Sequence, residues 1–169
     1  MKKINSVLLF CFVMMLTAII CQAQNPVMKD TAKTENKSAE VTQNKTDSKY
    51  KVGQMWSYKT RPQEKKSYFI IVKIDVHPKL GNIIHIAVHD LKIKNPNSRS
   101  GFSDEVNHMP FSEAAINKSA DKLLKEKIDL PDYEEGYQLW KEAFDSHHAG
   151  IYTITLAEAV DAMEASLNQ

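Results

Sequence analysis

The pattern of apolar and polar positions predicts three consecutive β-strands in the middle of the chain. Residues 68–76 (YFIIVKIDV) are rich in β-branched and aromatic side chains, residues 83–93 alternate over a similar length, and residues 52–59 alternate more weakly. Turn-forming residues at 61–63 and 77–82 separate these segments. Consecutive strands joined by short turns predict an antiparallel meander of three to four strands, either open or curved into a half-barrel.

Two amphipathic helices are predicted after these strands. The first begins at Ser112, a favourable N-cap, and places on one face Ile116, Ala120, Leu123 and Leu124. The second begins at Asp132 in a pattern like a capping box and carries an aromatic stripe of Tyr133, Tyr137, Trp140 and Phe144. Such a stripe belongs to a buried core more often than to a ligand-binding surface, so we expect it to pack against the sheet.

The end of the chain predicts a short strand at 151–154 and a third helix, which begins with a capping box of Thr155 and Glu158. Residues 95–107 are polar and predict a loop. The expected order of elements is therefore βββ-α-α-β-α. This order is typical of an α+β fold with its helices gathered on one side of the sheet.

Residues 1–23 predict a signal peptide. Two lysines precede an apolar run over 7–21, and Ala23 ends a small-residue cleavage pattern that makes Gln24 the first residue of the mature chain. The alternatives are an uncleaved membrane anchor and lipidation at Cys21. The expected location is outside the cytoplasm, either periplasmic or secreted.

Composition divides the rest of the chain in two. Residues 24–49 contain no aromatic residue and no periodic pattern, so we expect a disordered polar spacer. Residues 50–169 contain both tryptophans, all six tyrosines and all six histidines, and their length suits a single α+β domain. Because both cysteines lie within 1–23, the mature domain has no thiol for catalysis, for a disulfide or for metal ligation.

Charge is divided unevenly along this domain. Residues 51–128 carry 14 basic and 8 acidic residues, a net charge of +6, whereas residues 129–169 carry one basic and nine acidic residues, a net charge of −8. This separation predicts two candidate binding surfaces, although a solvated surface is the simpler interpretation of each. The first lies around the turn after the first strand and comprises Trp56, Tyr58, Lys59, Arg61, Lys65 and Lys66. The second is the outer face of the last helix, with Glu158, Asp161 and Glu164.

The expected partner follows from charge and location. We expect one of Trp56 and Tyr58 to be buried and the other to be exposed beside the basic turn. Basic and aromatic residues together can bind nucleic acid, but export, a net charge of −1 after cleavage and the absence of a recognition motif argue against it. A protein or an anionic component of the envelope suits the location better. Contact with a membrane requires a lipidated Cys21 or a retained signal peptide.

No motif of a known catalytic class is present: the sequence lacks GxSxG, GxxxxGKS/T, GxGxxG, HExxH and CxxC. The only candidates for a general base or a metal site are histidines, and three of them form an alternative site near the sheet: His85, His89 and His108. His85 and His89 share one face of a strand but lie about 13 Å apart at the rise of a β-strand, so they cannot bind one metal ion together. We therefore predict no metal and no cofactor.

Several sequence stretches resemble those of a group of small, uncharacterised bacterial proteins. In chain order they are VGQMWSYKTRP at 52–62, LKIKNP at 91–96, HMPFS at 108–112, YEEGYQLWKEAFD at 133–145 and GIYTI at 150–154. The resemblance covers most of 51–169 and implies that this part is self-sufficient. It implies no activity, cofactor or catalytic residue.

These features together predict an exported, non-catalytic binding domain, for example an inhibitor or an immunity protein. The alternative is a small enzyme, or a ligand-binding or metal-binding protein, that uses the histidines. The absence of catalytic motifs favours the first interpretation and leaves the question of enzymatic activity open.

Mass spectrometry of the protein purified from cells that express the full chain tests the predicted signal peptide. We expect the mature chain to begin at Gln24, because the cleavage pattern ends at Ala23. An intact Met1 would contradict cleavage, and a lipid on Cys21 would support the lipoprotein alternative.

Overall fold

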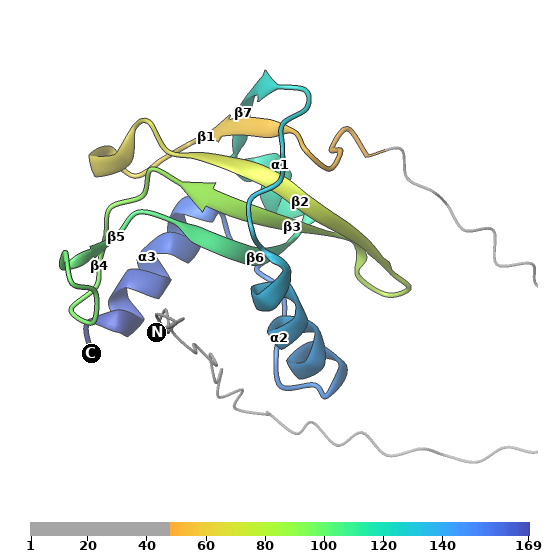
Figure 1. Cartoon of the computed structure of the whole chain (residues 1–169). Helices are drawn as coiled ribbons and strands as arrows, with labels where there is room; N and C mark the ends of the chain where they lie inside the picture. The colour runs from red at the N-terminus through yellow and green to blue at the C-terminus, as the bar shows by residue number, and fades with distance from the viewer. Residues whose placement is uncertain (1–47) are drawn as a thin grey trace, which may run out of the picture. The chain divides into compact units, whose positions relative to one another are not determined.

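A long antiparallel hairpin forms the centre of the main sheet in the computed structural model, which describes residues 48–169 (Figure 1). Its strands are β2 (Tyr68–His77) and β3 (Gly81–His89), and they pair along their whole length with a bulge next to Ile71. Both strands were predicted, although β3 begins earlier and ends earlier than expected. The predicted signal peptide and nearly all of the predicted spacer lie outside the described residues.

Three further strands complete the main sheet. β1 (Met55–Tyr58) pairs with β2, β7 (Ala120–Lys125) pairs with β1, and β6 (Val106–Ser112) pairs with β3. The strand order is β6-β3-β2-β1-β7, and all neighbours are antiparallel. A separate small sheet consists of β4 (Ile93–Lys94) and β5 (Phe102–Ser103).

The main sheet is larger than predicted, because two segments that were not predicted to be strands form its two edges. Residues 106–112 pair with β3, although the loop was predicted to extend to residue 107 and Ser112 to begin a helix. Residues 120–125 pair with β1, although they continue a helical pattern, because the backbone turns extended at Ala120. The expected strand at 151–154 is reduced to a single parallel bridge between Tyr152 and Phe111.

The described residues contain three α-helices: α1 (Glu113–Ser119), α2 (Glu134–Asp145) and α3 (Leu156–Leu167). Two predicted caps are confirmed. The Ser112 hydroxyl accepts a hydrogen bond from the backbone N–H of Ala115, and Thr155 and Glu158 form a capping box.

The start of α2 differs from the prediction. Its N-cap is Tyr133 without a side-chain capping bond, rather than Asp132. Tyr133 is half-buried and packs against an apolar cluster on the sheet. None of the helices within residues 48–169 combines the length and the apolar composition needed to cross a membrane.

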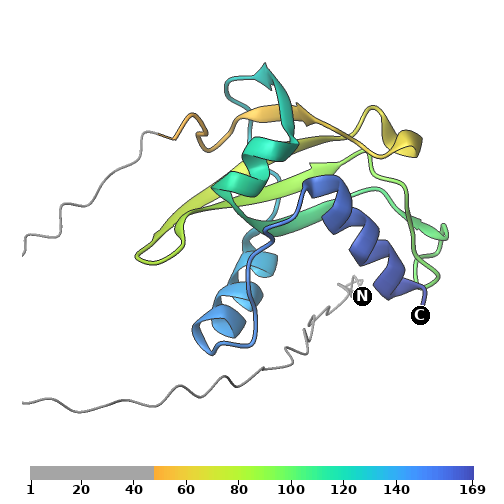
Figure 2. The same ribbon diagram turned by 180° about the vertical axis from the view of Figure 1, so that it is seen from behind.

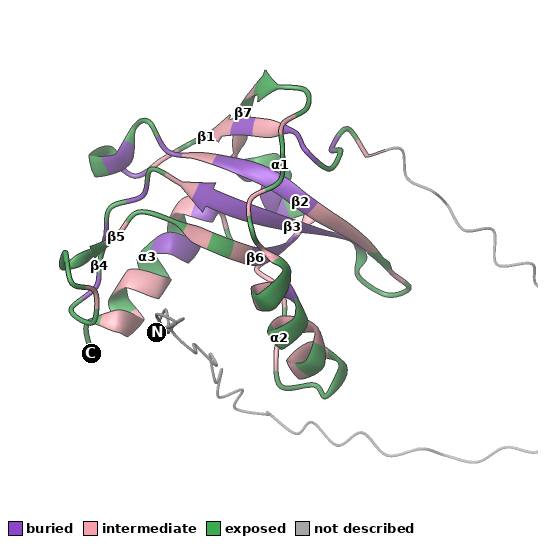
Figure 3. Ribbon diagram, viewed as in Figure 1, coloured by how far each residue is buried: buried purple, intermediate pink, exposed green. Residues whose placement is uncertain are grey.

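The helices lie on both faces of the sheet, which corrects the expectation that they gather on one side. Figures 1 and 2 show α1 and α3 on one face and α2 on the other. Beneath α1 and α3 is the main core, which includes Phe69, Ile71, Ile84, Ile86, Phe111, Ile116, Leu156 and Val160. The opposite face carries a smaller cluster of Ile70, Val72 and Ala87. Consecutive residues are buried over 69–72 of β2 and over 82–88 of β3 (Figure 3), so both faces of the sheet are covered there.

A buried arginine ties the turn after β1 to α3. Arg61 precedes a short 3₁₀ helix (Pro62–Glu64) and is only 4% exposed. Its guanidinium makes two parallel bonds of 2.8 Å to the Glu64 carboxylate. Its remaining nitrogen donates to Asp161 at 3.0 Å and to Glu164 at 2.7 Å, both on α3. Removal of either partner of such a bidentate, desolvated ion pair is strongly destabilising, because the other partner is left as a buried charge without an opposite charge.

Substitution of Arg61 tests this tie. We expect Arg61→Met to lower the free energy of unfolding by about 3–5 kcal/mol in urea titrations, because the Glu64 side chain, 0% exposed, loses its cation. Lys59→Met, which removes an exposed cation from the same turn, should change stability by less than about 0.5 kcal/mol. Adding Glu64→Leu to Arg61→Met should recover part of the loss. If Arg61→Met and Lys59→Met lowered the free energy of unfolding equally, the stabilising role of the Arg61 ion pairs would be contradicted.

Candidate functional site

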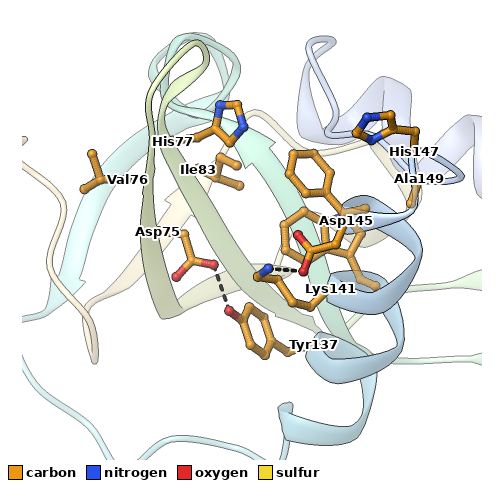
Figure 4. Close-up of a pocket in the computed structure, with 11 residues that line it drawn as sticks. Asp75, Val76, His77, Ile83, Tyr137, Lys141, Asp145, His147 and Ala149 are labelled. Carbon is orange, nitrogen blue, oxygen red and sulfur yellow. Dashed lines mark hydrogen bonds and ion pairs between the residues drawn. The ribbon is translucent and has the colours of Figure 1, made fainter.

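A cavity of about 600 Å³ lies between the β2–β3 hairpin and α2 (Figure 4). The strands contribute to its wall Asp75, Val76, His77 and Ile83. The helix and the turn after it contribute Tyr137, Trp140, Lys141, Phe144, Asp145, His147 and Ala149. The cavity therefore joins one aromatic helix face to the polar end of a hairpin.

The aromatic stripe of α2 both packs on the sheet and lines this cavity. Tyr137 is buried, and its ring meets the His85 ring edge-on with centroids 5.2 Å apart. Trp140 meets the same ring at 4.8 Å and stacks on Phe144 at 4.7 Å. The prediction that the stripe packs against the sheet is confirmed for Tyr137, whereas Trp140 and Phe144 are half-buried at the cavity.

A glycine brings α2 close to the sheet. A Cβ atom at Gly136 would lie 2.9 Å from the Cβ of His108, closer than side chains approach each other. Glycine inside a helix costs about 1 kcal/mol relative to alanine, and here it permits this contact. Sequence reasoning missed Gly136, although a glycine within a helical pattern is the signal that could have identified it.

Two of the three predicted histidines come together beneath the helix. His85 Nδ1 and His108 Nε2 lie 2.9 Å apart, so one ring nitrogen donates a hydrogen to the other. His85 is 0% exposed, and burial lowers its pKa to about 4 although the nearby Asp75 carboxylate raises it. Burial, together with repulsion from His85, lowers the pKa of His108 to about 3. Both rings are therefore neutral near pH 7.

His89 lies apart from this pair. It stacks on Tyr68 with centroids 5.4 Å apart, and its Nδ1 lies 3.4 Å from the Glu105 carboxylate. Within residues 48–169, no three His, Cys, Asp or Glu side chains are close enough together to hold a metal ion. Two of the three candidate histidines thus form a pair, in which His85 is buried and His108 is half-buried, and the third is a separate, half-buried ring.

Asp75 links the histidine pair to the cavity. Its Oδ2 accepts a hydrogen bond of 2.9 Å from the Tyr137 hydroxyl and lies 3.3 Å from His85 Nε2. Burial and the Asp75 carboxylate raise the pKa of Tyr137 to about 12, so the phenol stays a donor at neutral pH. Sequence reasoning missed Asp75, because a single carboxylate in a strand gives no signal without its neighbours in the fold.

Both aromatic residues of the predicted basic surface are buried, which corrects the expectation that one is exposed. Trp56 is 9% exposed and donates a hydrogen bond to Gln54, while Tyr58 is 5% exposed and bonds Ser67. Residues two apart on a strand point to the same face of the sheet, so both side chains are buried or both are exposed. Here both point into the main core.

The two predicted charged surfaces partly neutralise each other. Arg61 of the basic set is bonded to Asp161 and Glu164 of the acidic set. Glu158 is exposed and serves the capping box, where hydrogen bonds from Thr155 lower the pKa of its carboxyl. The remaining basic residues are exposed: Lys59, Lys65 and Lys66.

The neutral histidine pair predicts the loss of stability in acid. In the unfolded chain a histidine has a pKa of about 6.5. Below this pH the unfolded chain binds protons at these two histidines, whereas the folded protein does not, so unfolding becomes more favourable. Between pH 6.5 and pH 4, we expect each histidine to lower the free energy of unfolding by about 1.4 kcal/mol per pH unit.

Urea titrations of His108→Gln across this pH range measure the effect. The slope of the free energy of unfolding against pH should be smaller than in the natural protein by the contribution of one histidine, about 1.4 kcal/mol per pH unit. His148→Gln, at an exposed position, is the matched control and should keep the natural slope. An unchanged slope in His108→Gln would show that His108 is protonated in the folded protein.

Comparisons of this chain with models of protein families, with curated proteins and with solved structures give no match. The kinship predicted from the motifs at 52–62, 91–96, 108–112 and 133–145 stays a prediction. Conclusions about function therefore rest on the geometry of the cavity and its surroundings.

Proposed function

We propose that this chain is an exported, non-catalytic binding domain, and that it binds a protein partner through the cavity between the β2–β3 hairpin and α2. The observation that carries the proposal is the cavity itself, with aromatic rings on its helix side and a carboxylate, Asp75, on its strand side. Export rests on the pattern of residues 1–23.

The cavity has the size and lining of a recognition site. Binding pockets for small groups have volumes of about 300–1,000 Å³ and combine mostly apolar walls with a few polar groups. Its walls belong to a strand and a helix, and α2 is held in place by the histidine pair and by the close approach at Gly136. A site on such fixed elements binds without first having to order them.

The polar groups around the cavity favour recognition over proton transfer. The Nδ1 atom of His77 accepts hydrogen bonds from the backbone N–H groups of Lys79 and Leu80, so in the neutral ring Nε2 carries the hydrogen and can only donate. Lys141 is bonded to Asp145. The paired rings of His85 and His108 have pKa values of about 4 and 3, too low for an efficient general base at neutral pH.

Binding through the cavity takes the place of binding through the basic turn. Arg61 is occupied by Glu64, Asp161 and Glu164, and the aromatic neighbours of that turn are buried. An inhibitor or immunity protein that works through this site would receive a side chain of its target in the cavity.

Blocking the cavity tests the proposal. The immobilised protein should retain a partner from an envelope extract, and Ala149→Phe, which puts a phenyl ring at the cavity wall, should lose it. Ala114→Phe, at an exposed position on α1, is the matched control and should retain the partner. Equal retention by both variants would contradict binding at the cavity, and circular dichroism would verify that both fold.

A further inference from the structure

Asp75 is a partly buried carboxylate with no cationic partner. Its side chain is 28% exposed, and its Oδ2 atom contacts the Tyr137 hydroxyl and the neutral His85 ring (Figure 4). Among residues 48–169, no lysine or arginine forms an ion pair with it, and its Oδ1 atom makes no hydrogen bond. A charge in a partly desolvated position gains more from an opposite charge than one in water does.

The aromatic rings beside Asp75 form a surface suited to a cation. Phe144 stacks on Trp140 and meets the His77 ring edge-on at 5.7 Å. The faces of such rings attract ammonium and guanidinium groups by about 0.5–2 kcal/mol. The stripe already holds one cation in this way, because Lys73 Nζ lies 4.7 Å from the centre of the Tyr137 ring.

The charges around the opening also favour a cation. The cavity wall contains two carboxylates and one ammonium group, and that ammonium group, on Lys141, is bonded to Asp145. On α2, Lys141 is the single basic residue, against Glu134, Glu135, Glu142 and Asp145. On the strand side, Lys73 is held over Tyr137, and Lys79 lies in the exposed turn of the hairpin.

We infer that the cavity receives a basic side chain, lysine or arginine, which a partner protein inserts between the hairpin and α2 to pair with Asp75. This inference rests on the proposed function and names the group that the site recognises. An anionic group would meet Asp75 unfavourably, and a neutral group would leave its carboxylate without a direct ion pair, since the nearby Lys73 ammonium lies over the Tyr137 ring. Arginine is also among the residues that most often anchor protein interfaces.

Two small probes of nearly equal size test the inference on the purified protein as the cell processes it. Propylguanidinium carries the charge of an arginine side chain, and propylurea is its neutral counterpart with the same number of non-hydrogen atoms. Binding is followed by NMR at the indole N–H of Trp140, which is distinguished from that of Trp56 by a Trp56→Phe variant. We expect propylguanidinium to shift the Trp140 signal with an affinity at least about tenfold higher than that of propylurea.

Matched variants identify the residue responsible. Asp75→Asn keeps an acceptor for the Tyr137 hydroxyl and removes the charge, so it should weaken propylguanidinium binding by about tenfold or more. Asp104→Asn, at an exposed position outside the cavity, should bind as the natural protein does. Phe144→Leu keeps Asp75 and should weaken binding by a smaller factor. If Asp75→Asn does not fold, the salt dependence of binding in the natural protein decides, since only a charged contact weakens with salt.

The outcomes separate this inference from the proposed function. Equal binding of the two probes, unchanged binding by Asp75→Asn, or no shift at Trp140 with either probe would overturn recognition of a cation. In each of these cases the binding function stands if Ala149→Phe still loses the partner that Ala114→Phe retains. Loss of that difference overturns the proposed function, even if propylguanidinium binds.

Discussion

Helix α2 stays on the sheet because its aromatic stripe packs against two imidazole rings that are both uncharged. His85 and His108 satisfy each other through one hydrogen bond, and their burial keeps them neutral. A proton on either ring would place a charge where burial removes most of its hydration. The cavity, the position of Tyr137 and the setting of Asp75 all depend on this neutral contact.

Gly136 and Asp75 give this packed region the features of a binding site. The missing side chain at Gly136 lets the helix approach His108, and this approach brings Tyr137 within hydrogen-bond distance of Asp75. The carboxylate is then oriented by a phenol and a histidine, while one of its oxygens stays free to bind a donor. A polar group held in this way on strand and helix can recognise a ligand without rearrangement.

The second organising contact lies on the other face of the sheet, where Arg61 joins residues that are about 100 positions apart in the chain. It joins one cation of the positive segment to two carboxylates of the negative segment, while Lys59, Lys65 and Lys66 stay exposed near the same turn. On α2, four carboxylates face solvent against one lysine, close to the cavity that we propose as the binding site.

Local patterns determined a definite part of this structure. Interactions between residues close in the chain form three features: the hairpin of β2 and β3, the cap at Ser112 and the capping box at Thr155. Each of these features could therefore be predicted from the sequence. The aromatic stripe of α2 and the face of β3 that carries His85 were predicted for the same reason, and the stripe supplies three of the residues that line the cavity: Tyr137, Trp140 and Phe144.

Only the tertiary structure decided the rest. Residues 120–125 have a helical pattern but become a strand, because β1 offers an open edge whose backbone groups need partners. The pairing of β6 with β3 brings His108 to His85 across 23 positions, and the fold of α3 onto the turn buries Arg61. Asp75 and Gly136 acquire their roles from neighbours far along the chain. Contacts of this kind depend on which surfaces meet after the chain has folded, and no periodicity within a segment encodes that.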